Sequence, residues 1–95
     1  MADLVMKVRH ASAHRSGSQI VVQASGEAMN SRDDVFAETS TSGAAADVYV
    51  RTRPAGGFGT EMTGPFSVTV AISNATGIKT VKVHAKNGTK TIEVQ

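Results

Sequence analysis

His10 and His14 stand four positions apart and are two of the three histidines in the chain. On a helix this spacing would place both imidazoles on one face, where they could hold a metal ion. The Ala-Ser-Ala between them and the Ser-Gly soon after them are not typical of a stable helix. We therefore expect residues 10–17 to form a loop with exposed histidines. Together with Arg9 and Arg15, this loop would offer a cationic surface to a partner, without a metal site.

Asp33, Asp34 and Asp47 are the carboxylates to consider for calcium. A calcium loop needs several oxygen ligands at short, regular spacing, which two adjacent acids and one distant acid do not provide. The first turn of a short helix, capped by Asn30 or Ser31, explains the adjacent acids better. The chain has no cysteine to supply thiolate ligands. The sequence therefore predicts neither a metal nor another cofactor.

Tyr49 and Phe58 are the aromatic residues best placed to anchor a partner. Tyr49 belongs to a strand-like pattern that also contains Arg51, and Phe58 lies in a Gly-rich stretch at residues 56–59. Phe58 either tucks against a hairpin tip or stands exposed as a binding anchor, since aromatic residues often dominate interfaces. The Gly-rich stretch lacks the Gly-Lys-Ser/Thr ending of a phosphate loop.

The residue patterns favour binding over catalysis. No serine lies in a Gly-x-Ser-x-Gly elbow, and we find no plausible set of nucleophile, base and acid. One tyrosine near two arginines is too little for a platform on which nucleic-acid bases stack. We therefore expect a non-enzymatic protein that does not bind nucleic acid. Its partner-binding residues are predicted to be Arg9, His10, His14, Arg15, Tyr49, Arg51 and Phe58.

The composition indicates one small β-rich domain spanning residues 1–95. Hydrophobic residues make up 40% of the chain and aromatic residues 4%, so we expect one modest core. Nine glycines and many Ser and Thr favour strands and turns. No run approaches the ~20 apolar residues of a membrane span. The acidic Asp3 near the start is unlike a signal peptide, so we expect neither membrane insertion nor a cleaved signal.

The net charge of +2 is unevenly distributed, since the half after residue 47 has six cations and two acids. This basic half either meets an acidic partner or carries lysines on strand edges, where they prevent edge-to-edge aggregation. The second interpretation is preferred because the cations do not form the clustered patch typical of nucleic-acid binding.

Residues 80–95 predict a β-hairpin closed by Asn87-Gly88. Asn-Gly is favoured in the type I′ turn, where both turn residues have positive φ. This turn would place Val83 opposite Ile92 and Lys82 opposite Glu93, with apolar residues on one face. Val81 would then lie opposite Val94.

Apolar and polar residues alternate in several other segments. They predict strands over residues 4–9, 18–25, 47–53, 60–62 and 66–73. Residues 28–42 contain either a short helix or a strand around Val35–Ala37, and residues 39–46 are expected to form a loop. The predicted core consists of Ile20, Val22, Val48, Val50, Phe66, Val68, Val70, Val81, Val83, Ile92 and Val94.

About seven short strands separated by turns are typical of an antiparallel β-sandwich. The chain also resembles bacterial and bacteriophage immunoglobulin-like (fibronectin-III-like) domains. Three motifs carry the resemblance: the strand Ile20–Gly26 with its small residues and final Gly, the segment Gly64–Val70, and the segment Gly77–Ala85 before Asn87-Gly88. The chain lacks the Cys pair and buried Trp of antibody domains.

The resemblance implies an all-β, immunoglobulin-like fold and a non-enzymatic role. Domains of this family serve as spacers, adhesion modules or decorations on bacterial surfaces and phage particles. A single domain favours a virion accessory protein, such as a capsid decoration or tail assembly protein, that contacts capsid or tail proteins. A homo-oligomer is an open alternative to a monomer. It would be found in the virion, or in the host cytoplasm during assembly. The alternative is a carbohydrate- or cell-surface-binding module that uses Tyr49 and Phe58.

Overall fold

The computed structural model describes residues 3–28, 34–53 and 64–95. Within these residues the chain forms eight β-strands and no helix. The strands are β1 (Asp3–Leu4), β2 (Lys7–Ser16), β3 (Gln19–Ala28), β4 (Asp34–Ser42), β5 (Ala45–Arg53), β6 (Gly64–Ile72), β7 (Thr80–Ala85) and β8 (Gly88–Glu93). The same residues include no helix of the length and apolarity needed to cross a membrane.

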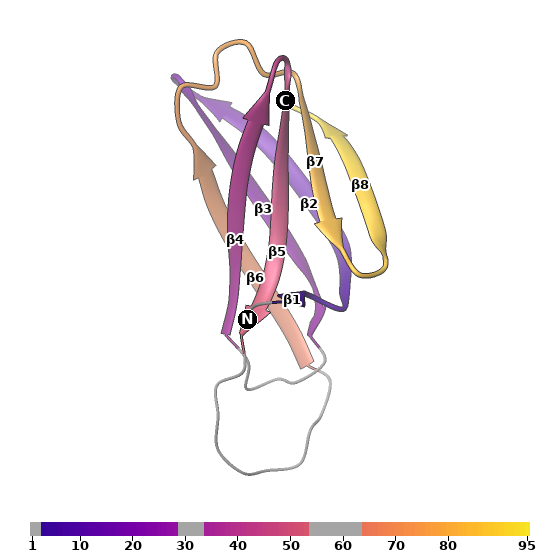
Figure 1. Cartoon of the computed structure of the whole chain (residues 1–95). Coiled ribbons are helices and arrows are strands. Elements are labelled where there is room, and N and C mark those ends of the chain that lie inside the picture. The colour runs from indigo at the N-terminus through magenta and orange to yellow at the C-terminus, as the bar shows by residue number, and fades with distance from the viewer. Residues whose placement is uncertain (1–2, 29–33, 54–63) are drawn as a thin grey trace.

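The strands form two sheets that face each other (Figure 1). One is a three-stranded sheet in the order β2-β3-β6. The other is a five-stranded sheet in which β5 is flanked by β4 on one edge, and by β7 and the short β1 on the other, with β8 beyond β7. The predicted all-β sandwich is therefore confirmed. One pairing differs from the antiparallel prediction, because β5 and β7 run parallel.

The core lies between the sheets and is built from Val, Ile and Ala side chains. Six of the predicted core residues are buried, with at most 3% of their surface exposed. These are Ile20, Val22, Val48, Val50, Val81 and Val83. The other five, Phe66, Val68, Val70, Ile92 and Val94, are half-buried and pack against the cluster. The cluster also includes residues outside the predicted core, among them Val5, Val8, Ala13, Ile72 and Ile78.

Of the predicted loop at residues 10–17, all but Gly17 belong to the long strand β2. The strand β2 pairs antiparallel with β3, with Ala11 opposite Ala24 and Ala13 opposite Val22. These small residues face the core, while Ser and His lie between them on the other face. The two faces therefore alternate as in any strand, but without bulky apolar side chains to reveal it in the sequence. Only Gly17 and Ser18 form the turn, where Gly17 has a positive φ of 63°.

A β-bulge at Arg9 interrupts the pairing of β2 with β3. Lys7 and Val8 pair with Glu27 and Gly26, but the register then shifts so that His10 pairs with Ser25. The extra residue puts both Arg9 and His10 on the exposed side. Gly26 makes this possible, because a Cβ atom there would lie only 2.0 Å from the main-chain oxygen of Lys7.

The segment after residue 33 forms a strand, and no part of residues 34–42 is helical. The strand β4 pairs with β5 along its whole length, from Asp34 opposite Arg53 to Ser42 opposite Ala45. The predicted loop at 39–46 is thus wrong: only Gly43 and Ala44 turn the chain. Thr39 and Thr41 are compatible with this outcome, since β-branched Thr suits an extended strand. The predicted strand at 60–62 lies outside the described residues.

The predicted C-terminal hairpin is present, but its register was wrong. Lys86 and Asn87 form the turn, and Val81 pairs with Ile92 instead of Val94. The expected type I′ turn is absent, because Asn87 does not have a positive φ and only Gly88 does, at 127°. A shift of two residues keeps every side chain on its predicted face, so the apolar face of the hairpin was correct.

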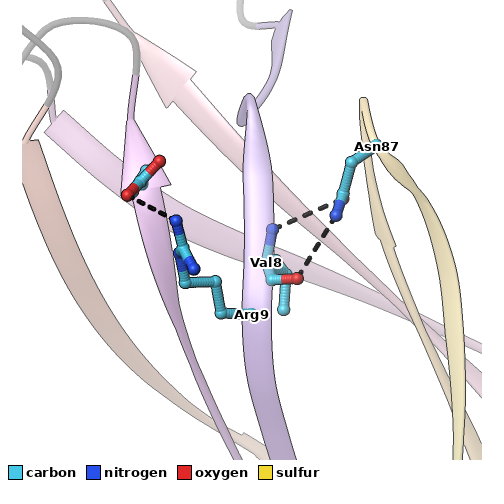
Figure 2. A network of polar contacts seen from close by, with 4 residues as sticks. Val8, Arg9 and Asn87 are labelled. Carbon is cyan, nitrogen blue, oxygen red and sulfur yellow. Dashed lines mark hydrogen bonds and ion pairs between the residues drawn. The ribbon is translucent and has the colours of Figure 1, made fainter.

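One side of the sandwich, between β2 and the β7–β8 hairpin, is joined by hydrogen bonds. The N–H of Gln95 donates to the oxygen of Ala13, and the N–H of Arg15 donates to the oxygen of Gln95, both at 3.0 Å. At the other end of β2, Asn87 reaches across to Val8 (Figure 2), with its Oδ1 3.4 Å from the N–H and its Nδ2 3.4 Å from the oxygen. These bonds occupy main-chain groups on the outer edge of β2.

Candidate functional site

The structure distributes the predicted partner-binding residues over both sheets. Arg9, His10 and His14 lie on the exposed side of the three-stranded sheet. Tyr49 and Arg51 lie on β5, on the outer face of the five-stranded sheet. Phe58 lies outside the described residues. The predicted residues therefore do not form one continuous surface, and the two outer faces have to be considered separately.

Four side chains form a straight row across the outer face of the five-stranded sheet. Glu38 on β4 is opposite Tyr49 on β5, Tyr49 is opposite His84 on β7, and His84 is opposite Thr89 on β8. We call these four residues the Tyr49 row. Residues in register on neighbouring strands lie on the same face of a sheet. The four strands thus present a line of polar and aromatic groups to solvent.

The rings of Tyr49 and His84 stack at the centre of the row. Their centroids are 4.6 Å apart and their planes are inclined by only 12°. The imidazole is held at both ends: Nε2 lies 2.8 Å from Oδ1 of Asp47, and Nδ1 lies 3.0 Å from Oγ1 of Thr89. Three contacts, two from β5 and one from β8, fix the ring, so His84 is a rigid part of this surface.

Asp47 also determines where the proton of the neutral imidazole lies. A carboxylate only accepts hydrogen bonds, so Nε2 of His84 carries the hydrogen and donates it. In the neutral ring Nδ1 then accepts the hydroxyl hydrogen of Thr89. The order carboxylate, imidazole, hydroxyl is also that of activated nucleophiles in hydrolases. Catalysis would further require groups that stabilise an oxyanion, whereas a rigid surface already favours binding, because little conformational entropy is lost on association.

Arginines extend the Tyr49 row along the strands. The guanidinium carbon of Arg51 lies over the Tyr49 ring, 5.3 Å from its centroid, and Nε of Arg51 is 3.3 Å from Oε1 of Glu38. Next to it, the guanidinium carbon of Arg53 lies 4.9 Å from the centroid of the Phe36 ring. Cation–π contacts of this kind contribute about 0.5–1 kcal/mol at exposed sites.

The outer face of the three-stranded sheet is different in character. Uncharged hydrogen-bonding side chains dominate it, arranged in rows such as His10, Ser25 and Ser67. A shallow hollow of about 280 Å³ lies over this part of the sheet. It is lined by His10, Ala11, Ser12, Gln23, Ala24, Ser25 and Ser67. His14 is exposed further along β2, opposite Val21.

Both arginines that flank the predicted loop already have partners within the chain. At the bulge, Nη2 of Arg9 is 2.8 Å from Oε1 of Glu27 on β3 (Figure 2). Arg15 donates to two main-chain oxygens between β6 and β7, from Nη1 to Ala75 at 2.9 Å and from Nη2 to Ile78 at 2.6 Å. Arg15 therefore holds the β6–β7 connection against the end of the sandwich.

Four contributors to the outer face of the five-stranded sheet were missed as binding residues: Phe36, Glu38, His84 and Thr89. Phe36 lies between Val35 and Ala37, which pack against the core while Phe36 does not. His84 lies in a clear strand pattern, but its partner strand, β5, is distant in sequence and parallel. Asp47, considered only for calcium, instead orients His84. Strand order, which a single sequence does not reveal, is what brings these residues together.

Comparisons with protein families, with curated proteins and with solved structures find no match to this chain.

Proposed function

We propose that this chain is a non-enzymatic interaction protein that binds a protein partner through the outer face of its five-stranded sheet. The observation that carries the proposal is the Tyr49–His84 stack, which contacts from Asp47, Thr89 and Arg51 hold in place. Tyr and Arg are enriched among residues that dominate interface energies. A surface already held in its binding geometry also loses little conformational entropy on association.

The biological setting that we propose is a virion, with the chain as an accessory protein that decorates a capsid or assists tail assembly. This part rests on the resemblance to immunoglobulin-like domains and is consistent with a small β-sandwich. Fold alone does not determine function, so the setting and the binding surface need separate tests.

Glycan binding is the weaker proposal for the same surface. A sugar ring binds an aromatic side chain by stacking on an open face of the ring. The imidazole of His84 stacks on Tyr49, and the guanidinium of Arg51 lies over the same ring. Both neighbours reduce the ring surface that is open to a sugar, whereas a protein partner could use the assembled cluster as it is.

The test is affinity capture from the native source with tagged wild-type chain and with the variant Tyr49→Ser, followed by mass spectrometry. We expect the wild type to recover capsid or tail proteins in near-stoichiometric amounts and the variant to lose them. His14→Ser is the matched control, because His14 is an exposed ring on the opposite sheet.

Recovery by the wild type and by Tyr49→Ser in equal amounts would contradict the proposed surface and leave the virion role intact. Recovery of no particle protein by the wild type would contradict the virion role. A glycan array probed with the wild type then tests the alternative, with Tyr49→Ser again as the variant expected to lose the signal.

A further inference from the structure

The strand β6 is an open edge of the three-stranded sheet. On one side it pairs with β3 along its whole length, from Gly64 opposite Ala28 to Ile72 opposite Ile20. On its other side no described strand pairs with it. All nine residues of β6 are uncharged, whereas natural edge strands are usually protected by lysines, prolines, bulges or inward-pointing charges. Of these devices β6 has only Pro65, near its first residue. This edge is therefore chemically ready to accept another strand.

The core-facing side chains of β6 are incompletely covered. Phe66, Val68 and Val70 face the core but are only half-buried. On the neighbouring β3, Ile20 and Val22 are at most 1% exposed. The difference arises at the edge, where β6 lies beside β4 of the opposite sheet and no strand of the described residues lies beyond it (Figure 1). A strand added to β6 would cover these three side chains.

We propose that β6 pairs antiparallel with β6 of a second copy of this chain, about a two-fold axis at Val68. This register places Phe66 opposite Val70 of the other copy, and Ser67 opposite Thr69. Core-facing residues then meet only core-facing residues, and outer residues meet only outer residues, over the full nine positions. An edge whose pattern reads the same in both directions suits an isologous dimer.

Charge favours β6 over the other edges for this pairing. Self-pairing of β4 in the corresponding way, about its central residue Glu38, would put two like charges directly opposite, which is destabilising. The edge strand β8 carries Lys90 and Glu93. The outer edge of β2 already accepts hydrogen bonds from Asn87 and Gln95. Pro65 lacks an N–H group, so each copy loses at most one hydrogen bond, at the two ends of the paired strands.

The experiment is sedimentation equilibrium with two charge variants on the exposed face of β6. In the proposed register, Ser67→Lys with Thr69→Lys places lysines opposite lysines at both symmetric pairs. Ser67→Glu with Thr69→Glu does the same with carboxylates. We expect the wild type to reach twice the 9.9 kDa of one chain. Each double variant should dimerise about tenfold more weakly, because cross-strand like charges are destabilising.

Mixing the two double variants gives the decisive result, because lysines then face glutamates across the axis. We expect the mixture to regain dimers at least as stable as those of the wild type. The control Ser12→Lys with Ser16→Lys adds the same charge to exposed positions of β2 in the same sheet, and it should dimerise like the wild type. Far-UV circular dichroism shows whether each variant is folded.

A monomeric wild type at the highest soluble concentration would overturn the proposal. So would double variants that dimerise as well as the wild type, or variants that dissociate without rescue on mixing. Weakening by the β2 control alone would place the interface elsewhere and would also overturn it.

Discussion

The side-chain amide of Asn87 pairs with the main chain of Val8 in the way that a neighbouring strand would. Its amide oxygen lies 3.4 Å from the N–H of Val8 and its amide nitrogen 3.4 Å from the oxygen of Val8, which is the two-way pattern of neighbouring strands (Figure 2). An Asn-Gly pair that predicts a turn thus also joins the two sheets. Asn87 still belongs to the turn, but it is the contact of its side chain with β2 that requires an asparagine at this position.

Substitutions of Asn87 should separate these roles. Asn87→Ala removes both hydrogen bonds, and we expect a loss of about 1 kcal/mol in the free energy of unfolding. Asn87→Asp should cost at least as much, because the carboxylate cannot donate to the oxygen of Val8. Urea denaturation measures both losses. The control is Gln23→Ala, an exposed amide, and equal losses for Gln23→Ala and Asn87→Ala would contradict the role of Asn87.

Arg15 should stabilise the sandwich through the β6–β7 connection. In Arg15→Ala the oxygens of Ala75 and Ile78 lose their guanidinium partner, and we expect about 1–2 kcal/mol less stability. Arg15→Lys should recover only part of this, because one ammonium group does not reproduce the two separated donors. Hydrogen exchange should speed up at Ile78, whose N–H bonds to Ala75. His14→Ala should leave both measurements unchanged, and a loss equal to that of Arg15→Ala would refute the assignment.

Gly26 should not tolerate a side chain. The added Cβ in Gly26→Ala would meet the main chain of Lys7 and Val8, with the closest atom at 2.0 Å. The backbone cannot give way as a flexible side chain does, so we expect a loss of at least the ~1–3 kcal/mol typical of overpacking. Gly77→Ala is the matched control, since no heavy atom lies within 4 Å of the added Cβ. Similar thermal midpoints for the two variants would contradict this prediction, because they would show that the main chain at the bulge can move away from the added Cβ.

Thr89 should act as a hydrogen-bond donor to His84 and not as a nucleophile. Wild type and Thr89→Ala are expected to hydrolyse an activated ester, such as p-nitrophenyl acetate, at the same slow rate. A rate in the wild type that disappears in both Thr89→Ala and His84→Ala would identify catalysis and refute the non-enzymatic proposal. Thr89→Ser is the control, because it keeps a hydroxyl group that can donate to His84 from the same position.

Alternation along single strands predicted the faces of the fold well. Val48 and Val50 on β5, and Val81 and Val83 on β7, are buried as expected, because burial of one face imposes a period of two. The predicted register of the last hairpin was wrong although its faces were right. The alternation of apolar and polar residues alone cannot distinguish two registers that differ by two residues, because both place the same side chains on the same face.

Segments without bulky apolar residues were harder to predict. The sequence of residues 10–16 is typical of a loop because alanines occupy the positions that face the core and serines positions that face solvent. The bulge at Arg9 also breaks the alternation. Residues 39–42 read as a loop because Thr and Ser carry little hydrophobic signal. Both segments are strands because long partners, β3 and β5, provide their hydrogen bonds. Tertiary pairing here outweighs local composition.

Little of the candidate surface could be predicted. Tyr49 and Arg51 were recognised from residue type, but their neighbours come from β4, β7 and β8. The contact of Tyr49 with His84 requires β7 to lie parallel to β5, next to it. No turn signal or charge pattern specifies this pairing.

The parallel pairing of β5 with β7 also affects the order in which the chain folds during synthesis. The partners of Ala45 to Tyr49 are Thr80 to His84, so β5 is translated well before its neighbour exists. The hairpin of β4 and β5 can form early, but on the other edge of β5 only the short β1 is available as a partner until β7 has been made. Contacts between segments so distant in sequence slow folding. Until β7 has been made, the nascent chain therefore carries β5 with residues 45–49 unpaired on one edge, and open strand edges of this kind favour aggregation during folding.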